Sequence, residues 1–139
     1  MAAANVRVLL ADDDEGFLES LRVLIDGQQH LSVAGTAADG LAAIELADSL
    51  APDAIVIDLH MPLLDGVTAV ARLRRDHPNL CLIALTGDET QRIHDAVREA
   101  GADAVLVKED FLGTLMDRLR AVRNDALEPR ATLRPPGAR

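Results

Sequence analysis

Aromatic residues are almost missing from this sequence. Its 139 residues include two phenylalanines, no tyrosine and no tryptophan. Proteins that bind single-stranded nucleic acids stack the bases on aromatic rings, so the sequence excludes a binding platform of that kind. The hydrophobic core must therefore be built from Leu, Ile, Val and Ala.

Cysteine and positive charge are also scarce. Cys81 is the only cysteine, so no disulfide can form within the chain, and its apolar surroundings predict a small core residue. The formal net charge is −9, whereas direct binding of nucleic acid requires a basic face. No apolar run is long enough to span a membrane, and the first residues do not resemble a secretion signal. We therefore expect a cytoplasmic domain without direct contact to nucleic acid or membrane.

Short apolar runs alternate with segments of helical spacing along the chain. The five runs are Val6–Ala11, Leu31–Gly35, Ala54–Ile57, Leu80–Leu85 and Ala104–Val107. Runs this short and this rich in Val, Ile and Leu are typical of strands buried on both faces. The segments that separate or follow them repeat apolar residues every three or four positions, which predicts five helices.

This alternation predicts an α/β domain with a parallel sheet. Right-handed crossovers leave few arrangements of five strands, and the commonest is the flavodoxin-like, doubly wound sheet with the order 2-1-3-4-5. Asp14 and Asp65 are expected to cap the first and third helices, and Gly101 to end the fourth.

The composition changes after Asn124. Residues 128–139 contain three prolines and no apolar period. Such a segment cannot bury enough apolar surface to fold. We therefore predict one domain over residues 1–124, and a flexible tail or a truncated linker over residues 125–139.

Polar residues occur where the apolar runs end. Asp12 and Asp13 follow the first run, Asp58 the third, Thr86 the fourth and Lys108 the fifth. Any one of them alone is more readily explained as an exposed surface residue. Because the carboxyl ends of parallel strands meet at one edge of the sheet, where ligands bind, we expect these side chains to converge there.

Three carboxylates in one place need a positively charged partner. Divalent cations with oxygen ligands fit this requirement, and magnesium is the usual one. Only one of the four histidines, His60, is near these residues, which argues against a zinc site. With the charge partly neutralised, one carboxylate can attack phosphorus, and Lys108 and the Thr86 hydroxyl can hold the phosphoryl oxygens.

These motifs together resemble the receiver domains of bacterial two-component response regulators. The resemblance extends from about Val6 to Val122. It rests on the opening strand with Asp12-Asp13, the strand ending in Asp58 with Met61-Pro62 and Asp65-Gly66 after it, Thr86-Gly87, and the last strand with Lys108. The opening strand and the Glu109-Asp110 pair are most similar to the subfamily whose members end in a LuxR-type helix-turn-helix domain.

The resemblance implies a role for each matching residue. Asp58 accepts a phosphoryl group from a sensor histidine kinase or a small phosphodonor. Asp12, Asp13, Asp58 and the backbone carbonyl of His60 bind Mg²⁺, and Thr86 and Lys108 bind the phosphoryl oxygens.

The resemblance also implies how such a protein works. The domain is expected to be a signalling switch rather than an enzyme, and a DNA-binding effector domain can follow it. A homodimer can form through the face of the fourth helix, fifth strand and fifth helix, or through the first and fifth helices. His60 and Asp88 are expected to flank the path of the water that hydrolyses the phosphoryl group.

One departure from the family affects output. Val105 stands where most relatives have Tyr or Phe, a ring that turns inward when the Thr at the site moves. The phosphorylation chemistry does not need this ring, so the departure concerns the relay of the signal alone.

Three other functions are compatible with parts of this pattern. The first is a binding module of the same fold that signals without phosphorylation. The second is a phosphatase that forms an aspartyl phosphate, but such enzymes carry a second Asp two residues after the nucleophile, where this chain has His60. The third is a nucleotide-binding domain, which needs a glycine-rich loop after the first strand, where this chain has acidic residues that repel phosphate.

Overall fold

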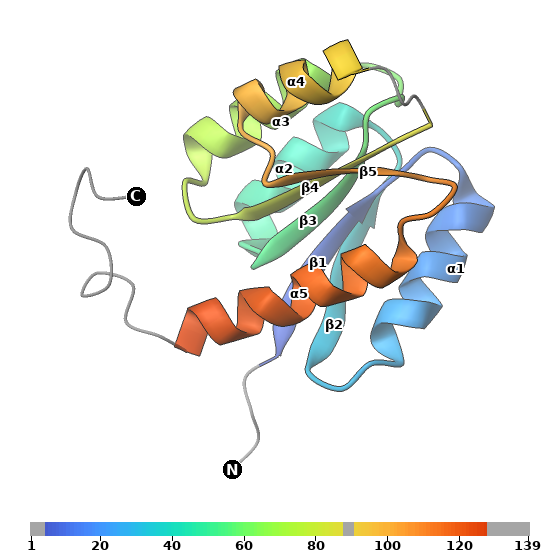
Figure 1. Ribbon diagram of the computed structural model, residues 1–139, viewed down its shortest axis with the longest axis vertical. Helices are drawn as coiled ribbons and strands as arrows, with labels where there is room; N and C mark the ends of the chain where they lie inside the picture. The colour runs from blue at the N-terminus through green and yellow to red at the C-terminus, as the bar shows by residue number, and fades with distance from the viewer. Residues whose placement is uncertain (1–4, 88–90, 128–139) are drawn as a thin grey trace.

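The computed structural model describes residues 5–87 and 91–127, in which strands and helices alternate (Figure 1). The strands are β1 (Val6–Ala11), β2 (Leu31–Ala37), β3 (Ala54–Asp58), β4 (Cys81–Thr86) and β5 (Ala104–Val107). The helices are α1 (Glu15–Asp26), α2 (Gly40–Leu50), α3 (Gly66–Asp76), α4 (Gln91–Ala100) and α5 (Leu112–Leu127). The predicted order of five strands and five helices is confirmed.

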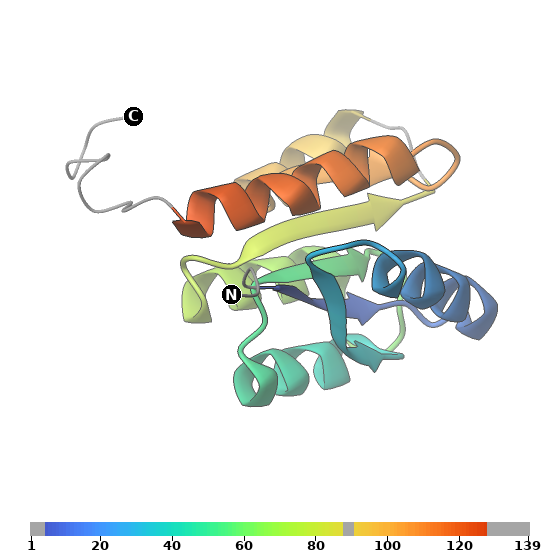
Figure 2. The ribbon, with the colours of Figure 1, turned by 90° about the horizontal axis from the view of Figure 1, so that it is seen from below.

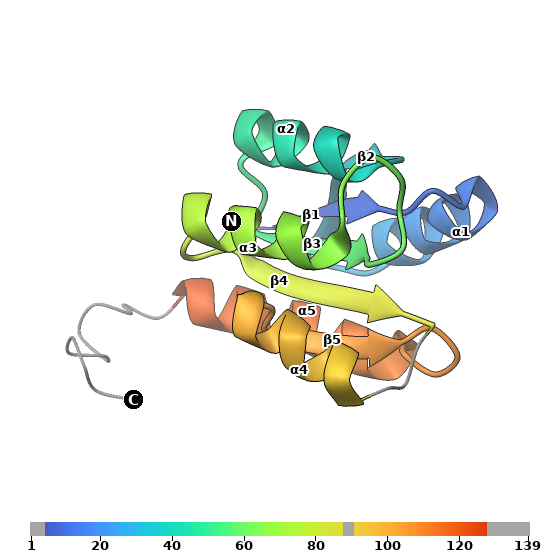
Figure 3. The same ribbon diagram turned by 90° about the horizontal axis from the view of Figure 1, so that it is seen from above.

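The strands form one parallel sheet with the order β2-β1-β3-β4-β5, as predicted. Helix α5 lies in front of the sheet in Figure 2, and α2, α3 and α4 lie in front of it in the opposite view of Figure 3. The strand arrows point toward the same edge, so the carboxyl ends of β1, β3, β4 and β5 meet there. This edge carries the residues that the sequence singles out.

Two apolar clusters hold the helices to the sheet. On the face of α1 and α5, Leu21, Ile25, Leu115 and Leu119 pack against Val8 and other strand residues. On the other face, alanines and aliphatic residues of α2, α3 and α4 pack against the alternate side chains of the same strands. Both clusters are aliphatic, as the near absence of aromatic residues requires.

The predicted helix ends are confirmed. Asp14 Oδ1 accepts a hydrogen bond of 3.1 Å from the backbone N–H of Phe17, and Asp65 Oδ2 accepts one of 3.3 Å from that of Thr68. Gly101 follows α4 with a φ of 126°, a conformation that L side chains rarely adopt. The two caps each satisfy an amide that the first helical turn leaves without a partner.

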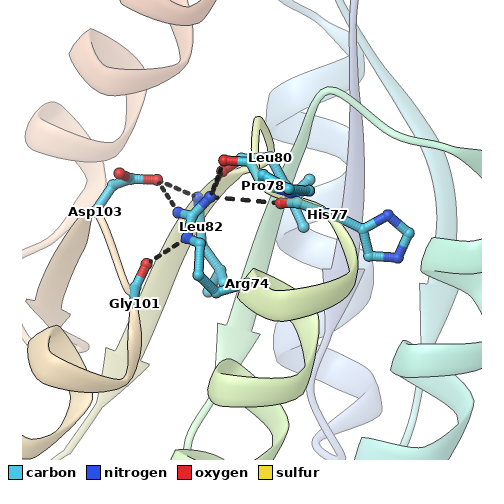
Figure 4. Close-up of polar contacts among 7 residues, drawn as sticks. All are labelled: Arg74, His77, Pro78, Leu80, Leu82, Gly101 and Asp103. Atoms are coloured by element: carbon cyan, nitrogen blue, oxygen red, sulfur yellow. Dashed lines mark hydrogen bonds and ion pairs between the residues drawn. The ribbon is translucent and has the colours of Figure 1, made fainter. Parts of the chain in front are cut away.

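Arg74 ties together the edge of the sheet opposite to the carboxyl ends (Figure 4). It extends from the end of α3, and its guanidinium donates to the carbonyl oxygens of Gly101 at 2.9 Å and of Pro78 and Leu80 at 2.8 Å each. It also pairs with the Asp103 carboxylate at 2.7 Å. One side chain thereby joins α3 to the starts of β4 and β5.

Some boundaries differ from the predicted ones. Strand β2 continues to Ala37, two residues beyond the predicted run, because its last residues pair with Leu10 and Ala11 of β1. Helix α5 continues to Leu127, three residues into the predicted tail. Residues 128–139 lie outside the described residues, so the division at residue 124 stays a prediction. In residues 5–87 and 91–127, no helix has both the length and the apolar character to cross a membrane.

Candidate functional site

The carboxyl ends of the strands bring the predicted site residues together. Asp58 and Thr86 are the last residues of β3 and β4, and Asp12 directly follows β1. They are the three buried polar residues in the described part of the chain, with exposed fractions of 2% for Asp12, 4% for Asp58 and 0% for Thr86. Burying polar side chains is costly unless they have partners, so this concentration at one edge indicates a functional site.

Lys108 supplies the positive charge of the site. It follows β5, and its backbone N–H donates to the Thr86 carbonyl at 2.9 Å, which fixes its place beside β4. Its Nζ lies 2.8 Å from Asp12 Oδ2 and 3.3 Å from Asp58 Oδ2. Lys108 thus lies beside the carboxylates, as expected from the sequence, and its ammonium bridges the two buried ones, which was not predicted.

Asp13 completes an acidic cluster. One carboxylate oxygen from each of Asp12, Asp13 and Asp58 lies within 4.8 Å of the others, and Asp13 is exposed. When ionised, the three carboxylates carry three negative charges, and the Lys108 ammonium offsets one of them. The cluster then has a net charge of about −2. A single divalent cation would balance that charge.

One buried oxygen of this cluster lacks a hydrogen bond. Asp12 Oδ1 accepts from the backbone N–H of Asp14 at 2.9 Å. Asp12 Oδ2 is buried and has no hydrogen-bond partner among the described residues, although Lys108 Nζ lies close enough to form an ion pair. Hard cations such as Mg²⁺ bind carboxylate oxygens, so the donor set fits a magnesium ion.

The titration of two groups reflects this arrangement. Burial raises the pKa of the Asp12 carboxyl above its ordinary value, and the Lys108 ammonium and the Asp14 amide only partly offset the effect. Partial burial by itself lowers the pKa of Lys108, but the neighbouring Asp12 and Asp58 carboxylates outweigh it and raise the pKa. Lys108 is thus charged at neutral pH, and Asp12 carries a charge that the fold accommodates poorly.

The loop between β3 and α3 positions His60. The backbone N–H of His60 donates to Asp58 Oδ1 at 3.0 Å, which directs the other oxygen toward Lys108. The loop turns back so sharply that a Cβ at Gly66 would lie 2.5 Å from the Leu59 carbonyl oxygen. Glycine is therefore required for the loop to close beside the site.

The His60 ring has a contact that the sequence did not predict. Its Nε2 lies 3.2 Å from Thr86 Oγ1, within hydrogen-bonding distance. The resemblance to receiver domains implied that the backbone carbonyl of His60 is a metal ligand and that its side chain lies beside the path of the hydrolytic water. Next to Thr86, Gly87 is exposed, and no described atom lies within 4 Å of where its Cβ would be. Asp88, the other expected neighbour of the water path, lies outside the described residues.

The two aromatic rings of the chain were also not predicted at this edge. Lys108 Nζ lies 4.5 Å from the centroid of the Phe17 ring, and the centroids of Phe17 and Phe111 are 5.6 Å apart. In the sequence, Phe17 is simply one more apolar residue of the first helix. The scarcity of aromatic residues was the only signal that could have drawn attention to the pair.

Three comparisons with known proteins agree with this geometry. A family model described as the response regulator receiver domain matches residues 8–120. The transcriptional regulatory protein PrrA of Mycobacterium leprae (strain TN) is 40% identical over 126 residues, which cover 86% of this chain and 50% of that protein. A protein-glutamate methylesterase/protein-glutamine glutaminase of Anaeromyxobacter dehalogenans (strain 2CP-C) is 36% identical over 119 residues, which cover 86% of this chain and 35% of that enzyme.

A solved structure shows the same fold. The two-component response regulator of the LuxR family from Aurantimonas sp. SI85-9A1 superposes with a TM-score of 0.80 at 25% identity, covering 88% of this chain and 87% of that chain. The chain spans half of the PrrA protein and about a third of the methylesterase. The similarity to the enzyme therefore concerns a minor part of that enzyme's length. In this chain, most of the matching part lies in the residues that fit the receiver-domain family.

Proposed function

Because the chain belongs to the family of response regulator receiver domains, we propose that it is a phosphorylation-dependent switch with Asp58 as the phosphoacceptor. The observation that supports this most is the convergence of buried Asp12, Asp58 and Thr86 with Lys108 at one edge of the sheet. A sensor histidine kinase, or a small phosphodonor, is the proposed source of the phosphoryl group.

The transfer is a substitution at phosphorus. An oxygen of the Asp58 carboxylate forms a bond to phosphorus, the bond from phosphorus to the donor histidine nitrogen breaks, and its electron pair stays with that nitrogen. Lys108, already 3.3 Å from Asp58 Oδ2, and the Thr86 hydroxyl would hold the transferred oxygens. Gly87 leaves open space beside Thr86 for the larger phosphorylated side chain.

Magnesium is part of the proposal. Asp12, Asp13 and Asp58 would hold the ion, with the backbone carbonyl of His60 as a further ligand. The ion would supply positive charge where a phosphoryl group adds a charge of about −2 to an already acidic cluster. Asp12 Oδ2, which is buried and pairs with Lys108 Nζ at 2.8 Å, is an oxygen for which the ion would compete with Lys108.

The proposal also covers where the switch acts and which partners receive its signal. We place this reaction in the cytoplasm and infer that the domain itself acts as a switch rather than an enzyme. The related PrrA protein is a transcriptional regulator twice the length of the match. A DNA-binding effector domain in the same protein is therefore the proposed target. The surfaces proposed for a homodimer are the α4–β5–α5 face and, as the alternative, the α1–α5 face.

Local chemistry argues against two other functions. An aspartyl-phosphate phosphatase would need a second carboxyl group two residues after the nucleophile, and His60 stands there with its ring against Thr86. A nucleotide-binding loop after β1 would need amide groups open to phosphate, but Asp14 caps α1 with its own carboxylate.

Beryllofluoride, an analogue of the phosphoryl group, tests the proposal. We expect NMR spectra of the wild-type chain to show Mg²⁺-dependent binding of beryllofluoride, with shifts at Thr86 and Lys108. Asp13→Ala should weaken Mg²⁺ binding tenfold or more, about 1.4 kcal/mol. Asp117→Asn on α5, whose side chain is 82% exposed, is the matched control and should bind Mg²⁺ like the wild type. Spectra that do not respond to beryllofluoride would instead favour a binding module that signals without phosphorylation.

A further inference from the structure

We propose that Phe17 is a positioning residue for Lys108: its ring holds the ammonium at the place where a phosphoryl group is bound. This inference rests on the proposed function, which makes Lys108 a ligand of the phosphoryl oxygens. It adds a residue of α1 to the site and gives a role to the aromatic pair that the chain retains.

The position of the ring supports a specific role. Lys108 Nζ lies 4.5 Å from the Phe17 centroid, within the distance at which a cation is attracted to the face of a ring. The same ammonium contacts Asp12 at 2.8 Å and Asp58 at 3.3 Å. Two carboxylates and one aromatic ring thus define where the end of this side chain lies.

The ring is itself held on two sides. The backbone N–H of Phe17 donates to the Asp14 cap at 3.1 Å, so the residue is fixed at the start of α1 next to the acidic cluster. Phe111, just before α5, packs against it with the ring planes tilted by 47°. The chain has no other phenylalanine, tyrosine or tryptophan, so its two phenylalanine rings both lie beside this site.

Lys108 needs such support because its partners change during the reaction. Lysine has a flexible stem, and ordering it costs conformational entropy. A cation bound by the acidic cluster competes with Lys108 for Asp12 and repels it, whereas phosphoryl oxygens attract it. The Phe17 ring carries no net charge, so its attraction to the ammonium persists when Asp12 becomes occupied.

Removal of the ring should weaken the binding of beryllofluoride without weakening the binding of Mg²⁺. In Phe17→Leu, Lys108 is held less well near the site, so beryllofluoride with Mg²⁺ should bind about threefold more weakly, the size expected from a partly exposed cation–π contact. Mg²⁺ alone should bind as in the wild type or more tightly, because Lys108 competes less for Asp12. A general loss of structure would instead weaken the binding of both Mg²⁺ and beryllofluoride.

The experiment has one readout without ligands and one with them. In the metal-free wild type, NMR should show the Lys108 Cε protons shifted upfield by the Phe17 ring, an effect absent in Phe17→Leu and retained in Phe17→Tyr. Titrations with Mg²⁺, and then with beryllofluoride at saturating Mg²⁺, follow for the same three proteins. Phe17→Tyr keeps the ring and should bind beryllofluoride within about twofold of the wild type.

Failure of the positioning role and failure of the proposed function give different results. If the wild type itself binds no beryllofluoride, the proposed function fails. If the wild type binds it and Phe17→Leu binds it equally well, or if the wild-type Lys108 protons show no upfield shift, the positioning role of Phe17 is overturned. The wild-type shift needs no variant, so it decides the contact even if Phe17→Leu does not fold.

Discussion

Two side chains of the site, His60 and Asp12, give the sharpest expectations for single residues. The His60 ring contacts Thr86, the residue proposed to hold a phosphoryl oxygen, at 3.2 Å. We expect a side chain at this place to influence both the Thr86 hydroxyl and the approach of water to phosphorus. It should therefore affect the lifetime of the phosphorylated state more than the binding of the metal.

We expect His60→Leu to change the dephosphorylation rate threefold or more, an effect of about 0.7 kcal/mol on the barrier. His60→Gln can still form a hydrogen bond to Thr86 and should lie closer to the wild type. Mg²⁺ affinity should stay nearly intact in both, because their backbone carbonyls remain. Loss of label followed by intact-mass spectrometry measures the rates, and identical half-lives for all three proteins would refute this role.

Asp12 links the stability of the metal-free domain to pH. Its pKa in the folded chain is raised above 3.8 by burial, so the folded state binds this proton more tightly than the unfolded state. The contribution of Asp12 to the free energy of unfolding therefore falls as the pH rises from 3.8 through the raised pKa, and then stays low.

Asp12→Asn should thus be more stable than the wild type at pH 7 in the presence of a chelator. The difference should narrow as the pH falls toward 3.8. Urea unfolding followed by circular dichroism suits a chain without tryptophan. Asp117→Asn, which alters an exposed carboxylate, should show no such trend. A variant that is less stable than the wild type at pH 7 would contradict the cost assigned to the buried charge.

At the scale of elements, Arg74 makes the most consequential polar contacts away from the site. Its guanidinium joins α3 to the loop after α4 and to the start of β4, and it pairs with Asp103, which also accepts from the backbone N–H of Leu82 at 2.8 Å. These contacts hold the amino-terminal ends of β4 and β5, whose other ends carry Thr86 and Lys108. Strands β4 and β5 are thus held together at their amino-terminal ends by Arg74 and at their carboxyl ends by the bond from the Lys108 N–H to the Thr86 carbonyl.

Arg74→Ala should lower the free energy of unfolding by about 2–4 kcal/mol, because several hydrogen bonds to a charged group are lost together. Arg74→Lys should not restore the loss, since an ammonium cannot reproduce the planar fork. Arg75→Ala, at the next position with a side chain 69% exposed, is the control and should stay within about 0.5 kcal/mol of the wild type. Equal denaturation midpoints for the two alanine variants would refute the anchor.

The sequence predicts the order and arrangement of the elements better than the side-chain contacts between them. The order of strands and helices follows from apolar periodicity and the sheet order from rules of chain connection, so the convergence of Asp12, Asp58 and Lys108 could be predicted. The His60 and Phe17 contacts depend on side-chain rotamers and on packing between distant elements, which periodicity does not encode. Arg74 has the pattern of an exposed helix residue, and only the fold places carbonyl groups around it.

For the whole molecule, the main question is how a change at one edge reaches a partner. The resemblance to receiver domains implies that Val105 stands where an aromatic residue usually relays the signal. Val105 is 6% exposed and belongs to the apolar cluster beneath α4. A buried β-branched side chain is stiff at χ1, so it cannot swing between an inward and an outward position as a large ring does.

We therefore expect beryllofluoride to shift helix α4 by backbone motion without a rotamer change at Val105. The allosteric coupling should lie near the weak end of the usual range of about 1–3 kcal/mol. Val105→Tyr should strengthen it if the missing ring is what limits it. Methyl NMR of the free and beryllofluoride-bound forms measures both effects, and a large reorientation of Val105, or an α4 that does not respond, would overturn this expectation.

The most direct test of the central claim is the mass of the intact chain after treatment with a small phosphodonor. With Mg²⁺, the wild type should gain the mass of one phosphoryl group. With a chelator in place of Mg²⁺ it should gain none, and Asp58→Asn should gain none under either condition. Labelling of Asp58→Asn to the wild-type level, or labelling of the wild type that is unaffected by the chelator, would contradict the assignment of Asp58 and its acidic neighbours as a magnesium-dependent phosphoacceptor site.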